Sequence, residues 1–573
     1  MISIRIYIVN FRNFTPILYG MAVCTERNMN IGDKIMKLEF YKALNRMVSE
    51  ELRGTNPVPD LLGFLHIKRL FGPADFSSKL EDLVMTYKKE TCALSPLLKI
   101  DVPKANFTIR PMARPTTEDW LIYEAIIEYL SKKILRKNRR ICKKSFSILY
   151  FKNYKGKRTN PWLKFDETSR DFYKRKYEFV LTTDITGYYE NINLEELRKR
   201  IIDYLERDKK GIDLTSALFN ILRKWSDERI SGYSLPQGPP ASSFLADIFL
   251  DYIDRRMEKY KGYIRYMDDI RIFCKKKIEA KRALKDLTIA LRDLKLNINA
   301  KKTDIFSGKE VEKNLFDPEK SLMTIIEKTM KSGNIDLIQE SVIPALMKLT
   351  EGAFSNDKFE KRHLNFALYR LGILHNSGLN FNKTVIIEDI RKNLVTKPHH
   401  SGLFCYFLSL FPNDKTIPKF LISFLKSEDN IYEWQELKVL QSLLRFNFKA
   451  NHQEINFFLK YARDSTKQSA IRAFYFLLAG KHGSNRDRNL IIDSYSELSD
   501  VYTKIAVILS VQETGAPTRN DFYARIKRGE NNEDINKFIK YVKSLSKPIY
   551  FLTTERPKIE IYEQTEESYY EPI

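Results

Sequence analysis

The chain has 573 residues, a length that accommodates two to four domains. Hydrophobic residues make up 43% of it and charged residues 30%, which is typical of a globular protein and excludes collagen-like or low-complexity architecture. The net charge of +24 is concentrated in residues 1–300, which carry 57 basic and 38 acidic side chains, so this part is the expected contact for a polyanion such as nucleic acid.

The cysteines and the apolar segments favour a cytoplasmic protein. The five cysteines form no CxxC pair, which argues against a disulfide framework and against a zinc site built on cysteine. The apolar N-terminal stretch is interrupted by Arg5 and Arg12, unlike the unbroken core of a signal peptide. No later window approaches 18 uncharged apolar residues, so we expect no membrane contact and a cytoplasmic location.

Three regions follow one another along the chain. In residues 1–310, helical patterns give way to closely alternating strand, turn and helix signals, which predicts an α/β region. Residues 311–550 carry successive amphipathic helices, and residues 551–573 form an acidic, aperiodic tail that we expect to be poorly ordered. These bounds are the predicted domain limits.

An apolar strand signal over residues 179–183 ends in Asp184. A turn containing Gly187 follows it, and a helix start is expected near Asn193. A carboxylate at the end of a buried strand costs free energy unless it is paired or binds a metal ion. Taken alone, Asp184 is equally interpretable as a helix-capping residue.

A proline-rich loop over residues 234–239 leads into a helix that begins with the small residues Ala241, Ser242 and Ser243. Small side chains at a helix start let another backbone or a nucleobase approach closely. By itself, the segment is also interpretable as a plain loop with a helix cap.

Residues 262–274 predict a β-hairpin. Apolar and polar residues alternate on both sides of Met267, Asp268 and Asp269, which lie at or near the tip. Adjacent carboxylates on a tight turn repel each other, and a divalent cation between them relieves that repulsion. Hard oxygen ligands of this kind select Mg²⁺ or Mn²⁺.

In this order, the segments DITGYY (184–189), LPQGPPAS (235–242) and YMDD (266–269) resemble motifs A, B and C of reverse transcriptases, which are right-hand polymerases. Two flanking segments agree. Residues 108–119 resemble the RPxxxPxxxD segment in the fingers of bacterial retroelement enzymes, and residues 296–303 resemble the LNxxKT segment of the palm. The resemblance implies an α/β right-hand palm-and-fingers fold and a nucleotidyltransferase activity.

The resemblance also implies roles for the carboxylates. Asp184 and Asp268 would hold two Mg²⁺ (or Mn²⁺) ions about 3.5–4 Å apart, which clamp the attacking and leaving oxygens. Asp269 would support that metal pair, and Ile185 is the further metal-site position in motif A.

A second set of residues would contact the incoming nucleotide. Arg110 would pair with triphosphate oxygens, and Lys302 is a candidate phosphate contact or proton donor. Backbone amides of residues 185–189 would lie near the triphosphate: Ile185, Thr186, Gly187, Tyr188 and Tyr189. Tyr189 would also act as a steric gate against the ribose 2′-OH, and Gln237 and Gly238 would border the nucleotide or the template. A core tyrosine at 189 and a surface arginine at 110 are the structural alternatives.

The helical region predicts an array of repeats. Apolar residues spaced three and four apart recur on helices about every 17–20 residues, which favours a HEAT-like α-solenoid. The faces are Leu437, Leu440, Leu443 and Leu444; Ile455, Phe458, Leu459 and Ala462; Ile471, Phe474, Leu477 and Leu478; and Tyr502, Ile505, Ala506 and Leu509. An irregular helical domain without true repeats is the alternative.

Two expected features of related enzymes are missing. Residues after the LNxxKT segment show no thumb signature, and the pair His399-His400 has no cysteine partners, so we interpret it as structural or surface. A palm joined to a helical region in place of a thumb resembles the abortive-infection (Abi) reverse transcriptases of bacterial phage defence. For that group the resemblance implies template-independent DNA synthesis from dNTPs, single-stranded DNA attached to a tyrosine, homo-oligomers, and a phage or host trigger.

Two other functions remain open at this point. One is a templated RNA-directed DNA polymerase of retron or diversity-generating type, which would depend on an RNA template and a primer. The other is a catalytically dead palm that serves as a nucleic-acid-binding scaffold, although a scaffold would not need the carboxylates Asp184, Asp268 and Asp269.

Overall fold

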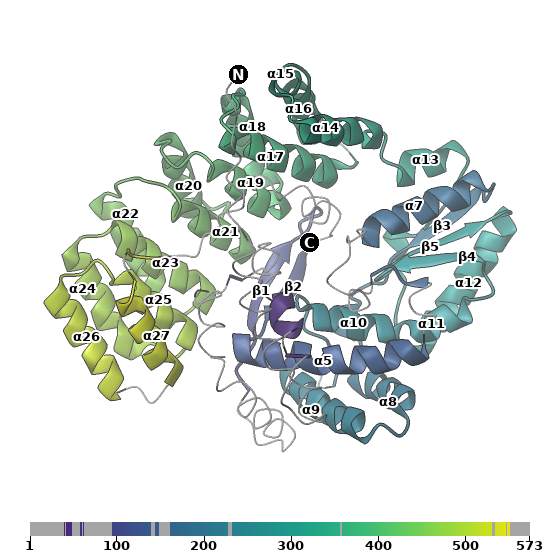
Figure 1. The fold of residues 1–573 in the computed structure, drawn as a ribbon, viewed down its shortest axis with the longest axis horizontal. Coiled ribbons are helices and arrows are strands. Elements are labelled where there is room, and N and C mark those ends of the chain that lie inside the picture. The colour runs from purple at the N-terminus through teal and green to yellow at the C-terminus, as the bar shows by residue number, and fades with distance from the viewer. Residues whose placement is uncertain are drawn as a thin grey trace.

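The structure, a computed structural model, describes residues 39–40, 42–47, 58–59, 61, 94–138, 144–147, 161–226, 232–355, 358–529, 533–545 and 547–550. The predicted tail at 551–573 lies outside these residues. Figure 1 shows the described part as an open arc: the palm forms one end, the helical region curves away from it, and a two-stranded hairpin lies between them.

The palm is built on a four-stranded antiparallel sheet with the strand order β4-β5-β3-β6. The strands are β3 (Phe179–Thr183), β4 (Gly262–Tyr266), β5 (Asp269–Cys274) and β6 (Asp304–Ser307). Along β3, Val180 packs on one face of the sheet and Leu181 on the other, and both are buried. Helices therefore cover both faces, which explains why the strands are nearly continuous apolar runs.

The helices of this part divide between the two faces of the sheet. One face packs on α7 (Pro161–Lys174) and on α13 (Lys309–Leu315). The other face packs on the larger core, to which α5 (Thr117–Lys137), α8 (Leu194–Leu205), α9 (Lys209–Trp225), α10 (Pro240–Phe249), α11 (Asp251–Arg256) and α12 (Lys277–Asp293) contribute. The 3₁₀ turns η2 (Tyr189–Asn191) and η3 (Ala300–Lys302) lie at the sheet edge. The predicted helix start near Asn193 is confirmed, since its side chain accepts a hydrogen bond from the Glu196 amide.

The central hairpin consists of β1 (Leu98–Pro103) and β2 (Ile109–Arg114). Ile100 and Val102 of β1 are buried in the hydrophobic core of the helical region, not in that of the palm. At the hairpin tip, the Tyr432 hydroxyl donates a hydrogen bond to the Phe107 carbonyl at 3.1 Å. The hairpin therefore shares its core with the helical region, although it lies within the predicted palm-and-fingers segment.

The helical region runs from α14 to α27 and contains no described strand. Its helices are α14 (Lys320–Ser332), α15 (Ile335–Leu337), α16 (Ile343–Phe354), α17 (Glu360–Asn376), α18 (Lys383–Thr396), α19 (Ser401–Leu408), α20 (Thr416–Lys426), α21 (Glu433–Leu443), α22 (His452–Arg463), α23 (Ser469–His482), α24 (Asn485–Ser494), α25 (Val501–Ser510), α26 (Ala516–Gly529) and α27 (Glu533–Lys543). The π turn η4 (Ile338–Val342) and the 3₁₀ turns η5 (Pro398–His400) and η6 (Tyr495–Glu497) connect some of them.

The predicted apolar faces of this region are confirmed as helix faces. Every residue of the sets on α21, α22 and α23 is buried, and in the set on α25 only Tyr502 is half-buried. The helices with odd numbers form one row, because α17 contacts α19, α19 contacts α21, α21 contacts α23, and α23 contacts α25. The helices between them pack against this row from outside, which gives the curved array in Figure 1.

Ion pairs join the start of the helical region to the palm. Lys320 of α14 contacts Asp166 of α7, with 2.8 Å between the ammonium nitrogen and a carboxylate oxygen. Asp317, which lies between α13 and α14, accepts hydrogen bonds from Arg362 and His363 of α17. These contacts fix the first helices of the array relative to the sheet.

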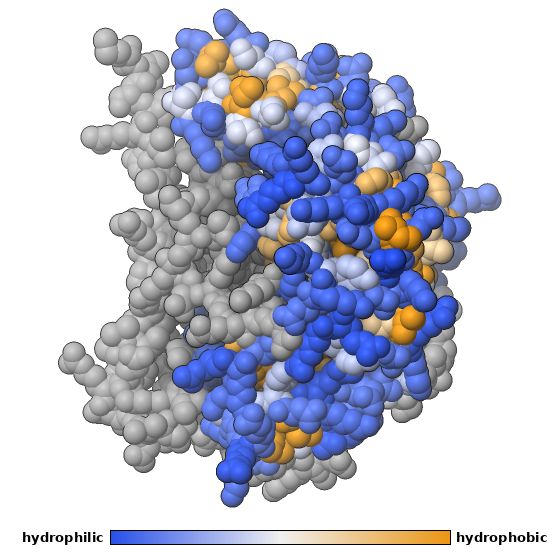
Figure 2. All heavy atoms as spheres, turned by 90° about the vertical axis from the view of Figure 1, so that its right-hand side faces the viewer, coloured by the Kyte–Doolittle hydropathy of each residue, from blue (hydrophilic) through white to orange (hydrophobic). Residues whose placement is uncertain are grey.

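Figure 2 shows the face formed by the palm side of the molecule, where hydrophilic side chains predominate and apolar ones are scattered. Among the helices of the described part, none combines the length and the apolar character that crossing a bilayer requires.

Candidate active site

Three carboxylates meet at one end of the palm sheet. Asp184 follows the last residue of β3, and Asp268 and Asp269 stand at the turn between β4 and β5. Because β3 pairs with β5 such that Thr183 lies opposite Ile270, one further step along each strand brings Asp184 to Asp269. The fold therefore brings together the three aspartates that the sequence analysis singled out.

The electrostatics of this cluster are those of like charges held together. Burial raises the pKa of Asp268 to about 7, and the negative charge of Asp184 beside it adds to the rise. Desolvation also raises the pKa of Asp269; the Arg271 guanidinium works against this rise and the Asp184 carboxylate adds to it. Protons and cations are both attracted to such a site.

One cation already faces the cluster. The Lys302 ammonium lies 2.6 Å from a carboxylate oxygen of Asp184, and the Lys302 side chain is 66% exposed. Lys302 comes from η3, which is held near the site because the Asn299 amide donates a hydrogen bond to the Asp184 carbonyl. Lys302 thus contacts Asp184 from the solvent side and neutralises part of its charge.

The turn that carries Asp268 is held from two sides. Met267 adopts a positive φ of 54°, which costs a non-glycine residue roughly 1 kcal/mol. Its amide donates a hydrogen bond to the Ser147 hydroxyl at 3.2 Å, and its carbonyl accepts one from the Arg265 guanidinium at 3.3 Å. The predicted hairpin is confirmed, with Met267 and Asp268 as its two-residue tip.

Arg265 is itself fully buried and fully paired. Its guanidinium lies 2.5 Å from a carboxylate oxygen of Asp247 and 2.8 Å from one of Asp254. Desolvation would lower the pKa of this guanidinium, but the two carboxylates raise it well above its usual range. Two carboxylates and one guanidinium thus form a buried ion cluster that contacts the turn between β4 and β5.

The residues after Asp184 divide between the core and the site. Ile185 and Tyr188 have buried side chains, and the Tyr188 hydroxyl donates a hydrogen bond to the Ala246 carbonyl at 2.5 Å. The Thr186 amide donates to the Asn297 carbonyl at 2.9 Å. That amide is engaged within the protein, so the expected contacts with a triphosphate fall to the other amides of the turn, around Gly187 with its φ of 55°.

Tyr189 is half-buried at the edge of this site. Its hydroxyl lies 3.1 Å from the hydroxyl of Ser243 on α10, and its carbonyl accepts a hydrogen bond from the Leu235 amide. Burial raises the pKa of this phenol, so it is neutral at physiological pH. The Tyr189 ring therefore contacts α10 while its backbone belongs to the turn that follows Asp184.

The loop of Gln237 and Gly238 contacts the central hairpin through backbone atoms. The Ala113 amide of β2 donates a hydrogen bond to the Gln237 carbonyl at 2.8 Å. Gly238 has a φ of 143°, and a Cβ atom there would come within 2.6 Å of the Ala113 carbonyl oxygen. Glycine at 238 is thus required by the close approach of β2, a reason that the sequence analysis did not foresee.

The small residues after this loop also pack within the protein. The Ala241 amide donates a hydrogen bond to the Glu124 carboxylate, and the Ser242 hydroxyl contacts the Tyr123 hydroxyl at 2.9 Å. Both partners lie on α5, so these positions allow α5 and α10 to approach closely.

A family model described as reverse transcriptase (RNA-dependent DNA polymerase) matches residues 102–322, which include all of the carboxylates above. Residues 102–322 form a reverse transcriptase domain. The domain is that of a polymerase-type nucleotidyltransferase. A comparison with curated proteins found no match.

Solved structures of telomerases also resemble the chain weakly. The apo telomerase of Candida tropicalis, truncated from its C-terminal domain, has 15% identity and a TM-score of 0.29 over 40% of this chain and 55% of that chain. The telomerase of Candida albicans in complex with a fragment of telomeric RNA has 10% identity and a TM-score of 0.29, over 81% of this chain and 70% of that chain. The corresponding complex of Candida tropicalis has 12% identity and a TM-score of 0.31, over 70% of this chain and 68% of that chain. The chain spans about half the length of the first of these, and all of these TM-scores are too low to support an argument.

Two cations of the hairpin lie within electrostatic range of each other, and one of them lies within range of Asp184. Desolvation is the main cause that lowers the pKa of Lys104 at the hairpin tip, and the charge of Arg110 on β2 contributes. The charges of Asp184, Glu190 and Lys302 also act on the pKa of Lys104.

The sequence analysis missed Lys104, but a signal for it existed. A hairpin with Val102 opposite Arg110 puts residue 104 on the same face as Arg110.

A further cation comes from the helical region. Burial lowers the pKa of Lys361, on the first turn of α17, to about 8, and the positive charge of Arg110 contributes to this shift. Lys361 and Arg110 are 251 positions apart in the sequence, and no local pattern relates them. Only the fold, in which β1 packs on α21 and η5, brings the helical region to the hairpin.

The donor set fits divalent cations of the magnesium type. The carboxylates of Asp184, Asp268 and Asp269 are hard oxygen ligands, and the Ile185 backbone follows directly in the same turn. Burial raises the pKa values of Asp268 and Asp269 and the charge of Asp184 adds to both rises, and bound divalent ions would oppose this effect. These four positions are the candidate metal ligands.

Proposed function

We propose that this protein is a DNA polymerase of the reverse transcriptase type that uses a two-metal mechanism. It joins dNTPs without a template and attaches the single-stranded DNA product to one of its own tyrosines. Its role is abortive-infection defence against phage, as a cytoplasmic homo-oligomer that a phage or host component triggers. The observation that carries the chemistry is the meeting of Asp184, Asp268 and Asp269 opposite the cations of the hairpin.

The residues support phosphoryl transfer as follows. Mg²⁺ or Mn²⁺ bound at the carboxylates supplies Lewis-acid activation of the attacking hydroxyl and of the leaving pyrophosphate. Arg110 and Lys104 bind the triphosphate, and Lys302 moves from Asp184 to a phosphate oxygen. The hydroxyl oxygen then bonds to the α-phosphorus, and the bond from this phosphorus to the pyrophosphate breaks. The ring of Tyr189 excludes a ribose 2′-OH.

We also propose that the helical region is a HEAT-like array that replaces the thumb. Two observations support this interpretation: the helices of one row contact each other in order, and β1 is buried in the core of that array. A thumb holds the nucleic acid against the palm, and this array occupies the side of the hairpin from which Lys361 faces Arg110.

Protein priming and template independence are supported by the resemblance to Abi enzymes, and a single experiment tests them. The purified full-length chain is incubated with Mg²⁺ and labelled dNTPs in the absence of template and primer. The products are run on a denaturing gel before and after proteinase treatment. Asp268→Asn serves as the inactive variant, and Asp286→Asn, which changes an aspartate paired with Lys259 on the palm surface, serves as the matched control.

We expect label that remains on the wild-type protein and on the Asp286→Asn variant, and that proteinase releases. Product that forms only when RNA and a primer are added would replace this proposal with a templated polymerase. Equal results for wild type and Asp268→Asn would reject a catalytic role for the carboxylates and favour the scaffold.

A further inference from the structure

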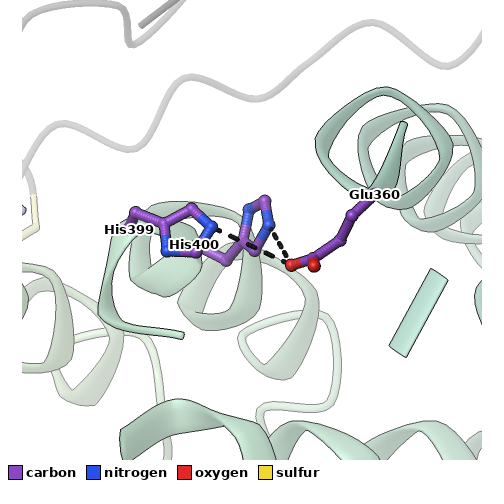
Figure 3. Close-up of side chains that lie close together, drawn as sticks. All are labelled: Glu360, His399 and His400. Atoms are coloured by element: carbon purple, nitrogen blue, oxygen red, sulfur yellow. Dashed lines mark hydrogen bonds and ion pairs between the residues drawn. The ribbon is translucent and has the colours of Figure 1, made fainter. Parts of the chain in front are cut away.

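A second cluster of metal-ligating side chains lies in the helical region. Glu360 is the first residue of α17, and His399 and His400 end the turn η5 that precedes α19. The His400 Nε2 lies 2.8 Å from Glu360 Oε1, and the His399 Nε2 lies 3.9 Å from the same oxygen. Figure 3 shows the two rings and the carboxylate pointing toward one another from these two elements.

The cluster is largely removed from solvent. The side chains of Glu360, His399 and His400 are 18%, 16% and 2% exposed. The two imidazole rings have their centroids 4.1 Å apart, and Phe404 covers His400 from the side of α19. Of the two interpretations of this histidine pair, structural or surface, the burial excludes the surface one, and its acidic partner lies 39 positions upstream of His399.

Charge neutralisation alone does not explain this arrangement. The other oxygen of Glu360 already accepts a 2.8 Å contact from the Lys397 ammonium, so the carboxylate has a cationic partner. Both imidazole rings nonetheless converge on the remaining oxygen of this carboxylate.

One ring atom of the cluster has no partner. The Nδ1 atom of His399 is buried and makes no hydrogen bond to any residue that the structure describes. Buried polar atoms of this kind are rare in proteins. Because the Nε2 atom of the same ring is the one that faces Glu360, Nδ1 lies on the far side of the ring, where a water molecule would be its partner.

The distances are close to those of a coordination sphere. Zinc binds imidazole nitrogen and carboxylate oxygen at about 2.0–2.2 Å, so two ligand atoms of a tetrahedral ion lie roughly 3.4 Å apart. The distances from Glu360 Oε1 to the two Nε2 atoms, 2.8 and 3.9 Å, lie on either side of this value. The three ligand atoms all lie within 4.8 Å of one another.

We propose that Glu360, His399 and His400 form a binding site for a divalent transition metal ion, with zinc as the preferred ion. Two imidazoles and one carboxylate select zinc over magnesium, which prefers oxygen ligands alone. Three protein ligands leave the fourth position to water. Lys397 remains paired with the other oxygen of Glu360 and orients the carboxylate.

The location gives the ion a structural task. The turn η5 contacts β1, and the residue after Glu360 is Lys361, which faces Arg110 of β2. An ion that joins η5 to the start of α17 therefore fixes the two elements on which the hairpin rests. This site does not depend on polymerase activity, because none of its ligands belongs to the palm.

The test uses the full-length chain with Asp184→Asn and Asp268→Asn, so that the palm carboxylates do not contribute to the metal count. The protein is treated with a chelator, incubated with Zn²⁺ and passed through a desalting column. Zinc is then counted by mass spectrometry, and Co²⁺ is added to a second sample to record the absorption of a four-coordinate site. His399→Ala and His400→Asn remove ligands, and His452→Ala, an exposed histidine of α22, is the matched control.

We expect one zinc ion per chain in the parent and in the His452→Ala variant, and at least tenfold weaker binding in both ligand variants. Zinc should raise the melting temperature of the parent but not that of His399→Ala. His399→Ala should disturb the fold less than His400→Asn, since one nitrogen of the His399 ring makes no hydrogen bond. The Co²⁺ spectrum is recorded on the parent alone, so it remains informative even if a ligand variant does not fold. Less than a tenth of an ion per chain, or equal binding by the ligand variants, would overturn the proposal.

Discussion

Carboxylates that are half-buried in the aspartate cluster of the palm and buried in the helical region differ in the groups that face them. In the helical region two of them meet a cation: Glu327 pairs with Arg370, and Glu436 accepts contacts from Lys467 and from the Tyr475 hydroxyl. In the aspartate cluster, Asp268 instead faces Asp184, and its pKa is raised.

The comparison separates two uses of buried charge. Paired carboxylates make the fold specific, and removal of one partner leaves the other charge buried and uncompensated. Like charges held together repel each other, and a bound cation relieves that repulsion, which is a property of binding and catalytic sites. The palm contains both kinds, since Arg265 with Asp247 and Asp254 lies directly below the catalytic turn.

The largest expected effect is on catalysis. Asp268→Asn should lower nucleotide incorporation by roughly a thousandfold or more, since the metal ions supply several kcal/mol and each 1.4 kcal/mol is a factor of ten. The same change should leave the melting temperature in chelator unchanged or higher, because it removes a like charge. The gel assay measures nucleotide incorporation, and calorimetry measures the melting temperature. A lower melting temperature would show that Asp268 is part of the structural framework.

The opposite pattern is expected below the turn. Arg265→Met leaves Asp247 and Asp254 buried without a cation, which should lower the free energy of unfolding by about 3–5 kcal/mol. Denaturant unfolding measures this, and Arg292→Met, at an exposed position near the end of α12, should stay within about 0.5 kcal/mol of wild type. Equal stability of the two variants would show that the pairing of Arg265 with Asp247 and Asp254 does not stabilise the fold.

A smaller effect should sharpen the comparison within the helical region. Lys361→Met removes a positive charge that acts on Arg110, so the KM for dNTP should rise roughly two- to fivefold with kcat unchanged. Steady-state kinetics measures this, with the exposed Lys348→Met as control. An unchanged KM would place Lys361 outside the nucleotide site.

The smallest effect concerns the hairpin tip. Tyr432→Phe removes the hydrogen bond to the Phe107 carbonyl, which is exposed and contributes about 0.5–1 kcal/mol. Amide hydrogen exchange in residues 98–114 should quicken a few-fold, while the melting temperature stays the same. Tyr252→Phe, which removes a comparable contact to Asp293 on the palm, should leave that exchange unchanged. Faster exchange in both variants would point to a general loosening.

The sequence predicted what depends on local spacing. The YMDD hairpin, the helix start near Asn193 and the apolar faces of α21 to α25 follow from periodicity and turn chemistry, and the structure contains them. The three aspartates could be grouped because motif order relates them.

Contacts between distant segments could not be predicted. Glu360 and His400 come together only because α17 packs on η5 and α19, and the burial of β1 in the helical core is equally invisible in the sequence. The close approach of Gly238 to the Ala113 carbonyl depends on how the hairpin sits on the palm. In each case the partner is chosen by tertiary packing, and no spacing within one segment encodes it.

The shared core of β1 and the helical array has a mechanical consequence. Because Ile100 and Val102 are embedded in the array, the hairpin that carries Arg110 and Lys104 is joined to the neighbouring helices as one unit. The hairpin also contacts the palm, since the Ala113 amide donates a hydrogen bond to the Gln237 carbonyl. A change in the curvature of the array would therefore be transmitted through the hairpin to the loop of Gln237 and Gly238.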